Sequence, residues 1–263
     1  MEHEILKQHL ENGVLTLTMD RPERRNAISL ELGDKIMGAL DKAATNPDVG
    51  VIILTGANGN FCVGGDVKSM AAGTRPGSFE ERVYSLRSRM DVSTMLHESP
   101  KPTIAMVRGA VAGAGLSMAL ACDLRVASET IKMTTAFAKV GLSGDFGGTY
   151  FLSKLVGTAK AREMYFMPEI MNGQQAHALG LVSRVVADKD LEAETMKVAR
   201  ALADGPRVTI SHMKANFNLA ERGTLAQVMD SEAIRHVRCT ETEDHKEAAA
   251  AFVEKRAARF KGR

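Results

Sequence analysis

Two glycine-containing turns are the parts of the sequence best suited to chemistry. One of them, GAVAGAG at 109–115, follows the apolar run Ile104–Val107 and leads into Leu116–Cys122, which is apolar enough for a buried helix. The leading N–H groups of a helix lack intrahelical acceptors, and the helix dipole there favours negative charge. Because Gly113 and Ala114 carry little or no side chain, an oxygen that becomes anionic during a reaction could approach these N–H groups. The alternative is a tight turn beside a buried helix.

The other turn, GANGNFCVGGDVKSM at 56–70, also follows a buried strand, Val51–Thr55. Its Gly64-Gly65 pair exposes backbone N–H groups directly after that strand. Two such turns in one chain could bring two donors onto a single oxygen. The sequence therefore predicts an anion-stabilising site that is assembled from two separate segments.

The elements that must position these turns alternate between strands and helices. VLTLTM at Val14–Met19 alternates with the period of a half-buried strand, and Ser29 is a helix cap that starts a helix running to about Ala44. A second helix is expected over Ser78–His97, and the chain is predominantly helical from Gly157 onward. These patterns predict an α/β fold. His97 is interpreted as a structural or surface residue because no partner for it is apparent.

The composition indicates a globular protein without a nucleic-acid-binding character. The formal net charge of the 263 residues is only +2, and Lys and Arg are dispersed. The three cysteines, Cys62, Cys122 and Cys239, have no metal-ligand spacing and are typical of a reduced, cytoplasmic compartment. No apolar stretch reaches the roughly 18 residues of a membrane span. We therefore expect a cytoplasmic protein with no metal, no nucleic-acid partner and no membrane association.

Five ordered segments of the chain resemble the crotonase (enoyl-CoA hydratase/isomerase) superfamily. They are LTGANGNFCVGGDVKSM, GAVAGAGLSMALACDLRVAS, AFAKVGLSGDFGGTYFLSKLVG, NGQQAHALGLVSRVV and FVEKRAARFKG. The resemblance implies an α/β superhelix of ββα turns. It also implies a core over residues 1–190 that carries the active site, and a C-terminal helical trimerisation region over 191–263. The expected assembly is a homotrimer or a hexamer.

The resemblance bears on the reaction through three positions. Hydratases of the superfamily use two glutamates to hold and activate a water, and the matching positions here are Ser117 and Phe137. Asp145, in the turn LSGDFGGT, matches the position at which isomerase branches carry an aspartate that moves a proton along the acyl chain. The aryl-CoA dehalogenase branch uses this position as a nucleophile but also needs a tryptophan, and the chain has none. Without the resemblance, the preferred interpretation of Asp145 is the N-cap of a helix that begins at Phe146–Thr149.

The substrate implied by the resemblance is a coenzyme A thioester, with no separate cofactor. The thioester oxygen would sit between the N–H groups of Gly65 and Ala114. Arg25 and Lys68 match the region that meets the phosphates and adenine of coenzyme A. Phe252 and Lys255 match tail positions that contact the nucleotide, commonly from the neighbouring subunit.

Three functions remain open on the sequence alone. The favoured one is an acyl-CoA isomerase that shifts a double bond or opens a strained ring through an enolate. The alternatives are an enoyl-CoA hydratase whose water is held by Asp145 and an unidentified group, and an inactive acyl-CoA-binding or RNA-associating scaffold. An intact Asp145 argues against an inactive site, and the dispersed charge argues against RNA.

Overall fold

A six-stranded, mostly parallel sheet forms the centre of the computed structural model, which describes residues 3–66 and 77–263. The strand order is β1-β2-β3-β4-β6-β8, in which β1 pairs antiparallel with β2 and the other neighbours pair in parallel. A separate two-stranded parallel sheet joins β5 and β7. The strands are β1 (Leu6–Glu11), β2 (Val14–Met19), β3 (Val51–Gly56), β4 (Thr103–Val107), β5 (Ala110–Ala112), β6 (Leu124–Ser128), β7 (Lys132–Thr134) and β8 (Arg184–Val186).

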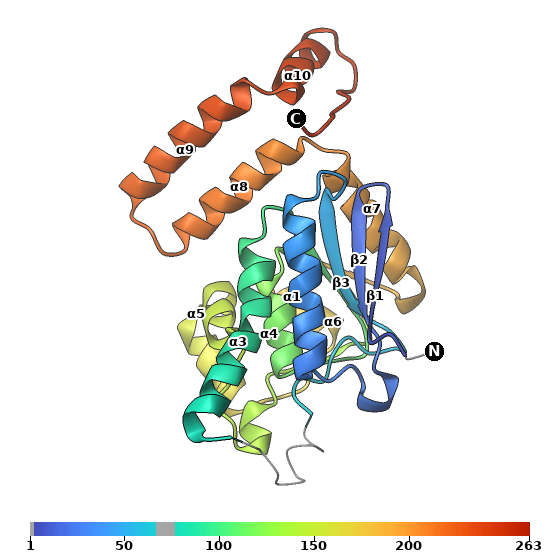
Figure 1. The fold of residues 1–263 in the computed structure, drawn as a ribbon, viewed down its shortest axis with the longest axis vertical. Coiled ribbons are helices and arrows are strands. Elements are labelled where there is room, and N and C mark those ends of the chain that lie inside the picture. The colour runs from blue at the N-terminus through green and yellow to red at the C-terminus, as the bar shows by residue number, and fades with distance from the viewer. Residues whose placement is uncertain (1–2, 67–76) are drawn as a thin grey trace.

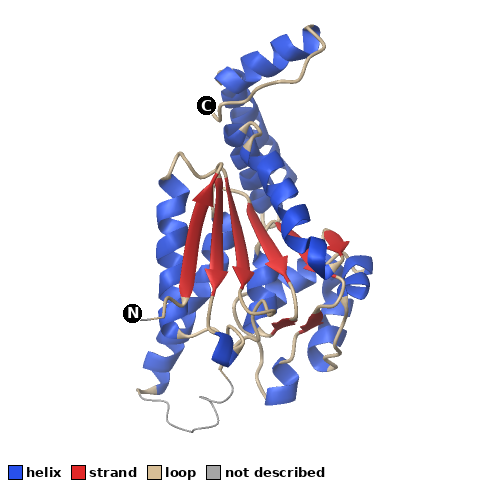
Figure 2. Cartoon of the chain, turned by 90° about the vertical axis from the view of Figure 1, so that its right-hand side faces the viewer, coloured by secondary structure: helices blue, strands red, loops and turns tan. Residues whose placement is uncertain are grey.

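Helices cover both faces of the sheet (Figures 1 and 2). They are α1 (Leu30–Thr45), α3 (Phe79–Glu98), α4 (Ala114–Ala121), α5 (Gly148–Phe166), α6 (Gly173–Ala178), α7 (Leu191–Ala203), α8 (Arg207–Ala220), α9 (Leu225–Thr240) and α10 (Glu243–Val253). Short 3-10 turns lie at η1 (Pro22–Arg24), η2 (Phe137–Val140) and η3 (Asp188–Asp190). The strand, strand, helix order that the resemblance implied recurs at β1-β2-α1, β4-β5-α4 and β6-β7-α5, whereas β3 stands as a single strand before α3 in the described part of the chain.

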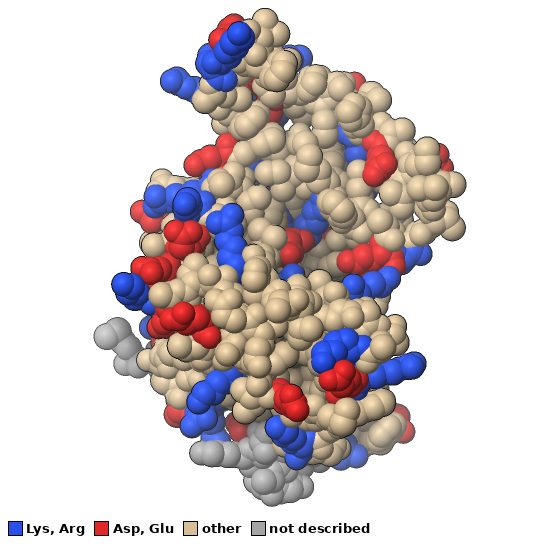
Figure 3. Space-filling view, turned by 180° about the vertical axis from the view of Figure 1, so that it is seen from behind, with Lys and Arg blue, Asp and Glu red and all other residues tan. Residues whose placement is uncertain are grey.

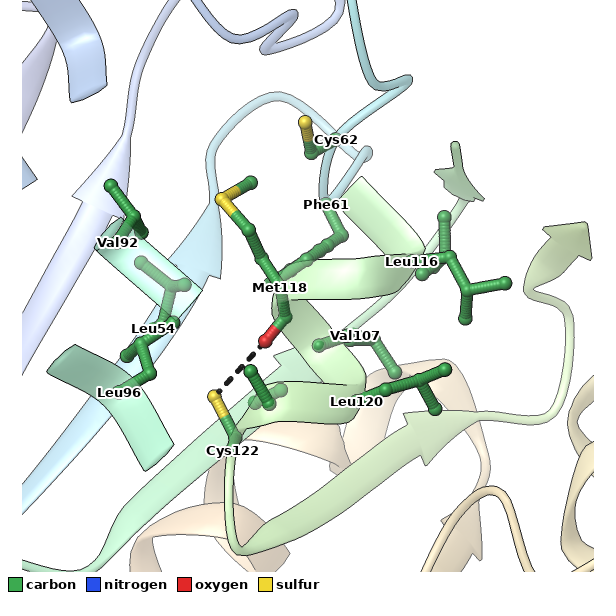
Figure 4. Packing of buried hydrophobic residues seen from close by; sticks show 14 of the residues in the cluster. Leu54, Phe61, Cys62, Val92, Leu96, Val107, Leu116, Met118, Leu120 and Cys122 are labelled. Atoms are coloured by element: carbon green, nitrogen blue, oxygen red, sulfur yellow. Dashed lines mark hydrogen bonds between the residues drawn. The ribbon is translucent and has the colours of Figure 1, made fainter. Parts of the chain in front are cut away.

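The central strand β3 is buried on both faces, so its side chains alternate between two cores. On one face Ile52 and Leu54 pack with α1, α3 and α4, whereas Val51 and Ile53 pack on the opposite face with α7. Helix α4 is wholly buried, with Leu116 and Leu120 projecting to one side and Met118 to the other (Figure 4). A helix buried all round needs apolar or small residues at every position, and AGLSMALA meets that need.

The C-terminal helices extend beyond the sheet at one end of the molecule. The parallel strands end at the opposite edge, so the turns that follow β3 and β4 lie far from α9 and α10 (Figures 1 and 2). Helix α7 packs against the sheet, whereas α8 and α9 pack mainly against each other. The division of the chain at residue 191 stays a prediction.

Basic and acidic side chains are interspersed on the face shown in Figure 3.

Several predicted elements match the structure closely. The strand Val14–Met19 has the predicted bounds, and α1 begins directly after Ser29, whose side chain accepts a hydrogen bond from the Leu32 N–H. Helix α4 begins at Ala114 rather than at Leu116. The difference arises because Gly113, with a φ of 52°, turns the chain into the helix two residues earlier than the apolar run suggests.

Candidate active site

The two glycine-containing turns lie side by side. The Cys62 N–H donates to the Ala110 carbonyl, and the Ala112 N–H donates to the Cys62 carbonyl, both at 3.0 Å. A Cβ on Gly64 would stand 2.8 Å from the Ala112 oxygen and 3.1 Å from the Ala114 nitrogen, and φ at Gly64 is +89°. Glycine is therefore required there both by the backbone conformation and by the close approach of the two turns.

Gly65 and Ala114, the residues of the two predicted N–H donors, lie next to this contact. Ala114 is the leading residue of α4, and its N-cap, Gly113, makes no side-chain capping bond. Within residues 3–66 and 77–263, no acceptor is bonded to the N–H of either Gly65 or Ala114. A pair of unpaired N–H groups beside a helix N-terminus is suited to stabilising an oxyanion.

Asp145 sits on a strained turn that follows η2. Positive φ angles occur at Gly144 (110°), Phe146 (50°) and Gly147 (74°), so the carboxylate is held in an unusual loop conformation. Helix α5 begins at Gly148 with Gly147 as its N-cap and no side-chain capping bond. Asp145 contributes only its backbone carbonyl, which accepts from the Gly148 N–H at 3.1 Å. The N-cap interpretation of the Asp145 side chain is therefore wrong.

The Asp145 carboxyl has an unusual environment. Its Oδ1 atom is buried and has no hydrogen-bond partner among residues 3–66 and 77–263. Burial raises the pKa of Asp145 to about 6, and the positive charge of Arg89 partly offsets this. Unpaired buried carboxyl oxygens are costly, so such a group is commonly found where it meets a ligand.

Three side chains around Asp145 come from distant parts of the chain. Cys62 and Tyr165 both experience its negative charge, and Arg89 of α3 supplies the nearby positive charge. Burial is the main cause that raises the pKa of the Cys62 thiol to about 12, so this cysteine is neutral. Sequence reasoning missed Arg89 and Tyr165 as site residues. Neither lies in a motif, and only the fold brings them to Asp145.

The two positions that hold glutamates in hydratases are occupied by groups that cannot ionise as acids. The Ser117 hydroxyl is buried and donates to the Gly113 carbonyl at 3.3 Å. The buried Phe137 ring stacks on Tyr165, with 5.7 Å between ring centroids and 19° between ring planes. An aromatic wall thus stands where a hydratase carboxylate would be.

The predicted nucleotide-binding residues are divided between the two ends of the molecule. Arg25 is exposed on the loop beside Gly64, and its carbonyl accepts from the Val63 N–H at 3.3 Å. Lys68 lies outside the described residues. Phe252 is 86% exposed in the last turn of α10, and Lys255 lies two residues beyond the end of that helix. One chain therefore does not bring these two residues to Asp145 (Figure 1).

His97 and Asp66 have structural partners. His97 Nε2 lies 3.3 Å from a Glu221 oxygen, and its ring meets Phe151 edge-on, which agrees with a structural role. Asp66 pairs with Arg24 at 3.6 Å. Of the described residues, no group of three or more His, Cys, Asp or Glu is placed to hold a metal ion. No helix in the described part of the chain is long and apolar enough to cross a membrane.

Comparisons with known proteins identify the family of the chain. The family described as enoyl-CoA hydratase/isomerase matches residues 9–263. The chain belongs to this family. Its sequence is 33% identical over 265 residues to the 1,2-epoxyphenylacetyl-CoA isomerase of Escherichia coli, and the alignment covers 99% of both chains. It is 31% identical over 267 residues to the trans-2-decenoyl-[acyl-carrier-protein] isomerase of Streptococcus mutans, with both chains covered in full.

Solved structures of the family share the fold. An enoyl-CoA hydratase from Polaromonas sp. JS666 superimposes with a TM-score of 0.92 at 33% identity, and the match covers 97% of this chain and 99% of that one. The crotonase fold predicted from the sequence is thereby confirmed. The sequence identity of this chain to the two isomerases is nearly the same as its identity to the hydratase. Sequence identity alone therefore does not decide between isomerisation and hydration.

Proposed function

We propose that this family member is an acyl-CoA isomerase in which Asp145 is the catalytic base. The observation that carries the proposal is the unpartnered, buried Oδ1 of Asp145, combined with a serine and a phenylalanine at the hydratase glutamate positions. A single carboxylate suits the transfer of one proton between two atoms of the substrate. Addition of water requires a group that also holds the water.

The thioester oxygen binds between the N–H groups of Gly65 and Ala114. Asp145 takes a proton from the acyl chain, and the electron pair left on carbon spreads onto the thioester oxygen as an enolate. The protonated Asp145 then returns the proton at a different atom, so that substrate and product are isomers. Each oxyanion donor lowers the barrier by roughly 3–4 kcal/mol, and the positioned base contributes about a hundred- to ten-thousandfold in rate.

The pKa of Asp145 suits both halves of this transfer. A carboxyl with a pKa raised to about 6 is ionised at neutral pH, and is a stronger base than an exposed aspartate. Once protonated, it still gives up its proton readily to an enolate carbon or an alkoxide. Burial without a hydrogen-bonding partner is what provides this intermediate basicity.

We further propose that the acyl group carries a ring. The stacked Phe137 and Tyr165 offer a flat aromatic wall next to the turn that carries Asp145. The Escherichia coli relative is named as the isomerase of 1,2-epoxyphenylacetyl-CoA, whose acyl group carries an epoxide on a six-membered ring. An epoxide fused to a ring is accordingly the substrate class that we favour.

Coenzyme A handling is proposed to need a second copy of the chain. Arg25 and Lys68 would meet the nucleotide from the chain that carries Asp145, whereas Phe252 and Lys255 would come from a neighbour in a trimer or hexamer. The C-terminal helices support such an assembly because they expose a series of large apolar side chains: Met213, Phe217, Leu225, Met229, Ile234, Val237, Phe252 and Val253. Coenzyme A enters as part of the substrate, and no separate cofactor is proposed.

The Asp145→Asn variant tests the proposed reaction. Asparagine keeps the shape of the side chain but removes the base, so we expect normal coenzyme A binding and loss of double-bond migration or ring opening. In D₂O the wild type should exchange a proton at the α or γ carbon of a suitable acyl-CoA. Rapid accumulation of 3-hydroxyacyl-CoA by the wild type would instead establish a hydratase. A wild type that binds thioesters tightly but turns none of them over would establish an inactive scaffold.

A further inference from the structure

Tyr165 reaches the candidate active site from the middle of α5. A Cβ on Gly144 would stand 2.9 Å from its Cε1 atom, so the ring lies against the turn that carries Asp145. A Cβ on Gly148 would stand 2.5 Å from the Tyr165 hydroxyl oxygen and still closer to the Ser117 hydroxyl. The absence of a side chain at Gly148 therefore leaves room for both hydroxyl groups, and Ser117 matches a hydratase glutamate position.

The Tyr165 phenol remains protonated at neutral pH. Burial, the largest cause, and the negative charge of Asp145 both raise its pKa above the ordinary value for tyrosine. A hydrogen bond with the Thr149 hydroxyl acts in the opposite direction but does not reverse the shift. A neutral phenol is a hydrogen-bond donor rather than a base. It therefore complements Asp145, which is ionised at the same pH.

The stacking on Phe137 fixes the ring that carries this donor. The two rings are nearly parallel, and Phe137 is buried while Tyr165 is half-buried. A Cβ on Gly113 would lie 3.7 Å from the Phe137 ring, so this pair also borders the N-cap of α4. A donor on a rigid ring, next to both the base and the oxyanion turn, is well placed to meet the acyl group of a bound thioester.

We propose that Tyr165 is a further catalytic residue, whose hydroxyl donates a hydrogen bond to an oxygen atom on the acyl group and so selects oxygen-bearing acyl groups over hydrocarbon ones. The inference rests on the proposed isomerase function and extends it by a named donor. A hydrocarbon enoyl chain has no atom to accept this bond. An epoxide ring has one, and its oxygen gains negative charge as the ring opens.

The step balances without any further reactant. Asp145 takes the proton from the carbon next to the thioester carbonyl, and the electron pair of that C–H bond spreads onto the thioester oxygen as the enolate. As this pair returns, it forms a double bond from that carbon to the next carbon of the acyl group. The adjacent carbon–oxygen bond of the three-membered ring breaks, and the oxygen leaves with the bonding pair as an alkoxide. This alkoxide takes the proton from Asp145, which gives a hydroxy-enoyl isomer. Tyr165 stabilises the alkoxide by its hydrogen bond and keeps its own proton.

The experiment compares Tyr165→Phe with wild type on two substrates, an epoxy-acyl-CoA and a hydrocarbon 3-enoyl-CoA. Loss of a donor that acts in the transition state is expected to lower kcat for the epoxide by about a hundredfold. The KM for the epoxide and the rate of double-bond migration should stay close to wild type. Tyr84→Phe is the matched control, because Tyr84 is 76% exposed on α3.

Gly148→Ala tests the same donor without removing it. The added methyl would displace the Ser117 and Tyr165 hydroxyls, whereas φ at Gly148 is compatible with alanine. We expect the same selective loss on the epoxide. Gly38→Ala serves as its control, because a Cβ there meets no atom within 4 Å.

Each other outcome overturns the inference. Equal rates for Tyr165→Phe and wild type would show that the hydroxyl does nothing, and equal losses on both substrates would reduce Tyr165 to a packing role. A wild type that migrates double bonds in an Asp145-dependent manner but opens no epoxide would refute the role of Tyr165 and leave Asp145 as the base. A wild type that isomerises neither thioester would refute the isomerase proposal itself.

Discussion

Lys214 of α8 forms a largely buried ion pair with Asp123, which directly follows α4: Nζ lies 2.7 Å from Oδ2. The same ammonium donates to the carbonyl oxygens of Leu96 and Lys101, at 3.0 and 3.2 Å. The Asp123 carboxylate also accepts from the N–H and the hydroxyl of Thr103. Helix α4, whose N-terminus carries the proposed oxyanion donor Ala114, is thereby connected at its other end to α8.

Lys214→Met is expected to be strongly destabilising. It removes the cation but leaves the carboxylate partly buried, and breaking one side of a buried pair costs about 3 kcal/mol. The Asp123→Asn, Lys214→Met double variant should recover part of that loss, because no unpaired charge remains. Urea unfolding measures the free energy of unfolding of the single and the double variant. Arg222→Met, which breaks an exposed pair with Glu98, should change the midpoint little. Equal effects of Lys214→Met and Arg222→Met would contradict the role assigned to the buried pair.

Local sequence signals were sufficient for the framework of the fold. The alternation at Val14–Met19 and the cap at Ser29 are short-range patterns, and both elements form where they were predicted. The resemblance supplied the superhelical arrangement, which periodicity alone does not contain. The two glycine turns were identified from the residues themselves, and the structure describes their contact through Gly64.

The remaining parts of the site depend on contacts between distant residues. Arg89 and Tyr165 carry no motif, and they reach Asp145 only because α3 and α5 converge on the turn after η2. The N-cap interpretation of Asp145 failed for a local reason. Gly147 and Phe146 adopt positive φ, which delays the start of α5 to Gly148 and leaves the carboxylate pointing elsewhere.

The Gly65 N–H is expected to contribute to turnover. Gly65→Pro removes this donor, and loss of one oxyanion donor should lower kcat by at least about tenfold. Gly65→Ala keeps the N–H and is the matched control for crowding in the loop. Coenzyme A affinity is measured alongside, by calorimetry, to detect distortion. Unchanged turnover with unchanged binding in Gly65→Pro would rule out this donor.

Removal of the chain from Ala248 onward is expected to weaken both assembly and coenzyme A binding. The deletion takes away Phe252 and Lys255, together with part of the apolar surface of the C-terminal helices. Analytical ultracentrifugation and a coenzyme A titration measure the two effects. Phe252→Ala within the full chain separates them, since it removes one proposed contact and leaves α10 in place. A truncated protein that stays oligomeric and binds coenzyme A normally would refute the shared site.

Activity and stability are expected to respond to pH in opposite directions at Asp145. Burial raises the pKa of this carboxyl to about 6, so kcat/KM for isomerisation should rise with pH and reach half its plateau near pH 6, as the base ionises. In the unfolded chain the same carboxyl has an ordinary, lower pKa. The folded state therefore binds more protons than the unfolded state between about pH 4 and 6, and folding stability falls as the pH rises through this window.

Asp145→Asn removes that penalty, so the inactive variant should unfold at a higher urea concentration than wild type at pH 7.5. At pH 5, where the wild-type carboxyl is mostly protonated, the difference should shrink, because the protonated acid is as neutral as the amide. Glu80, an exposed carboxylate at the start of α3, provides the control: Glu80→Gln should not show this gain at neutral pH. An Asp145→Asn variant that is less stable than wild type at pH 7.5 would mean that the carboxylate is held by favourable contacts rather than stored, unpaired, for the substrate.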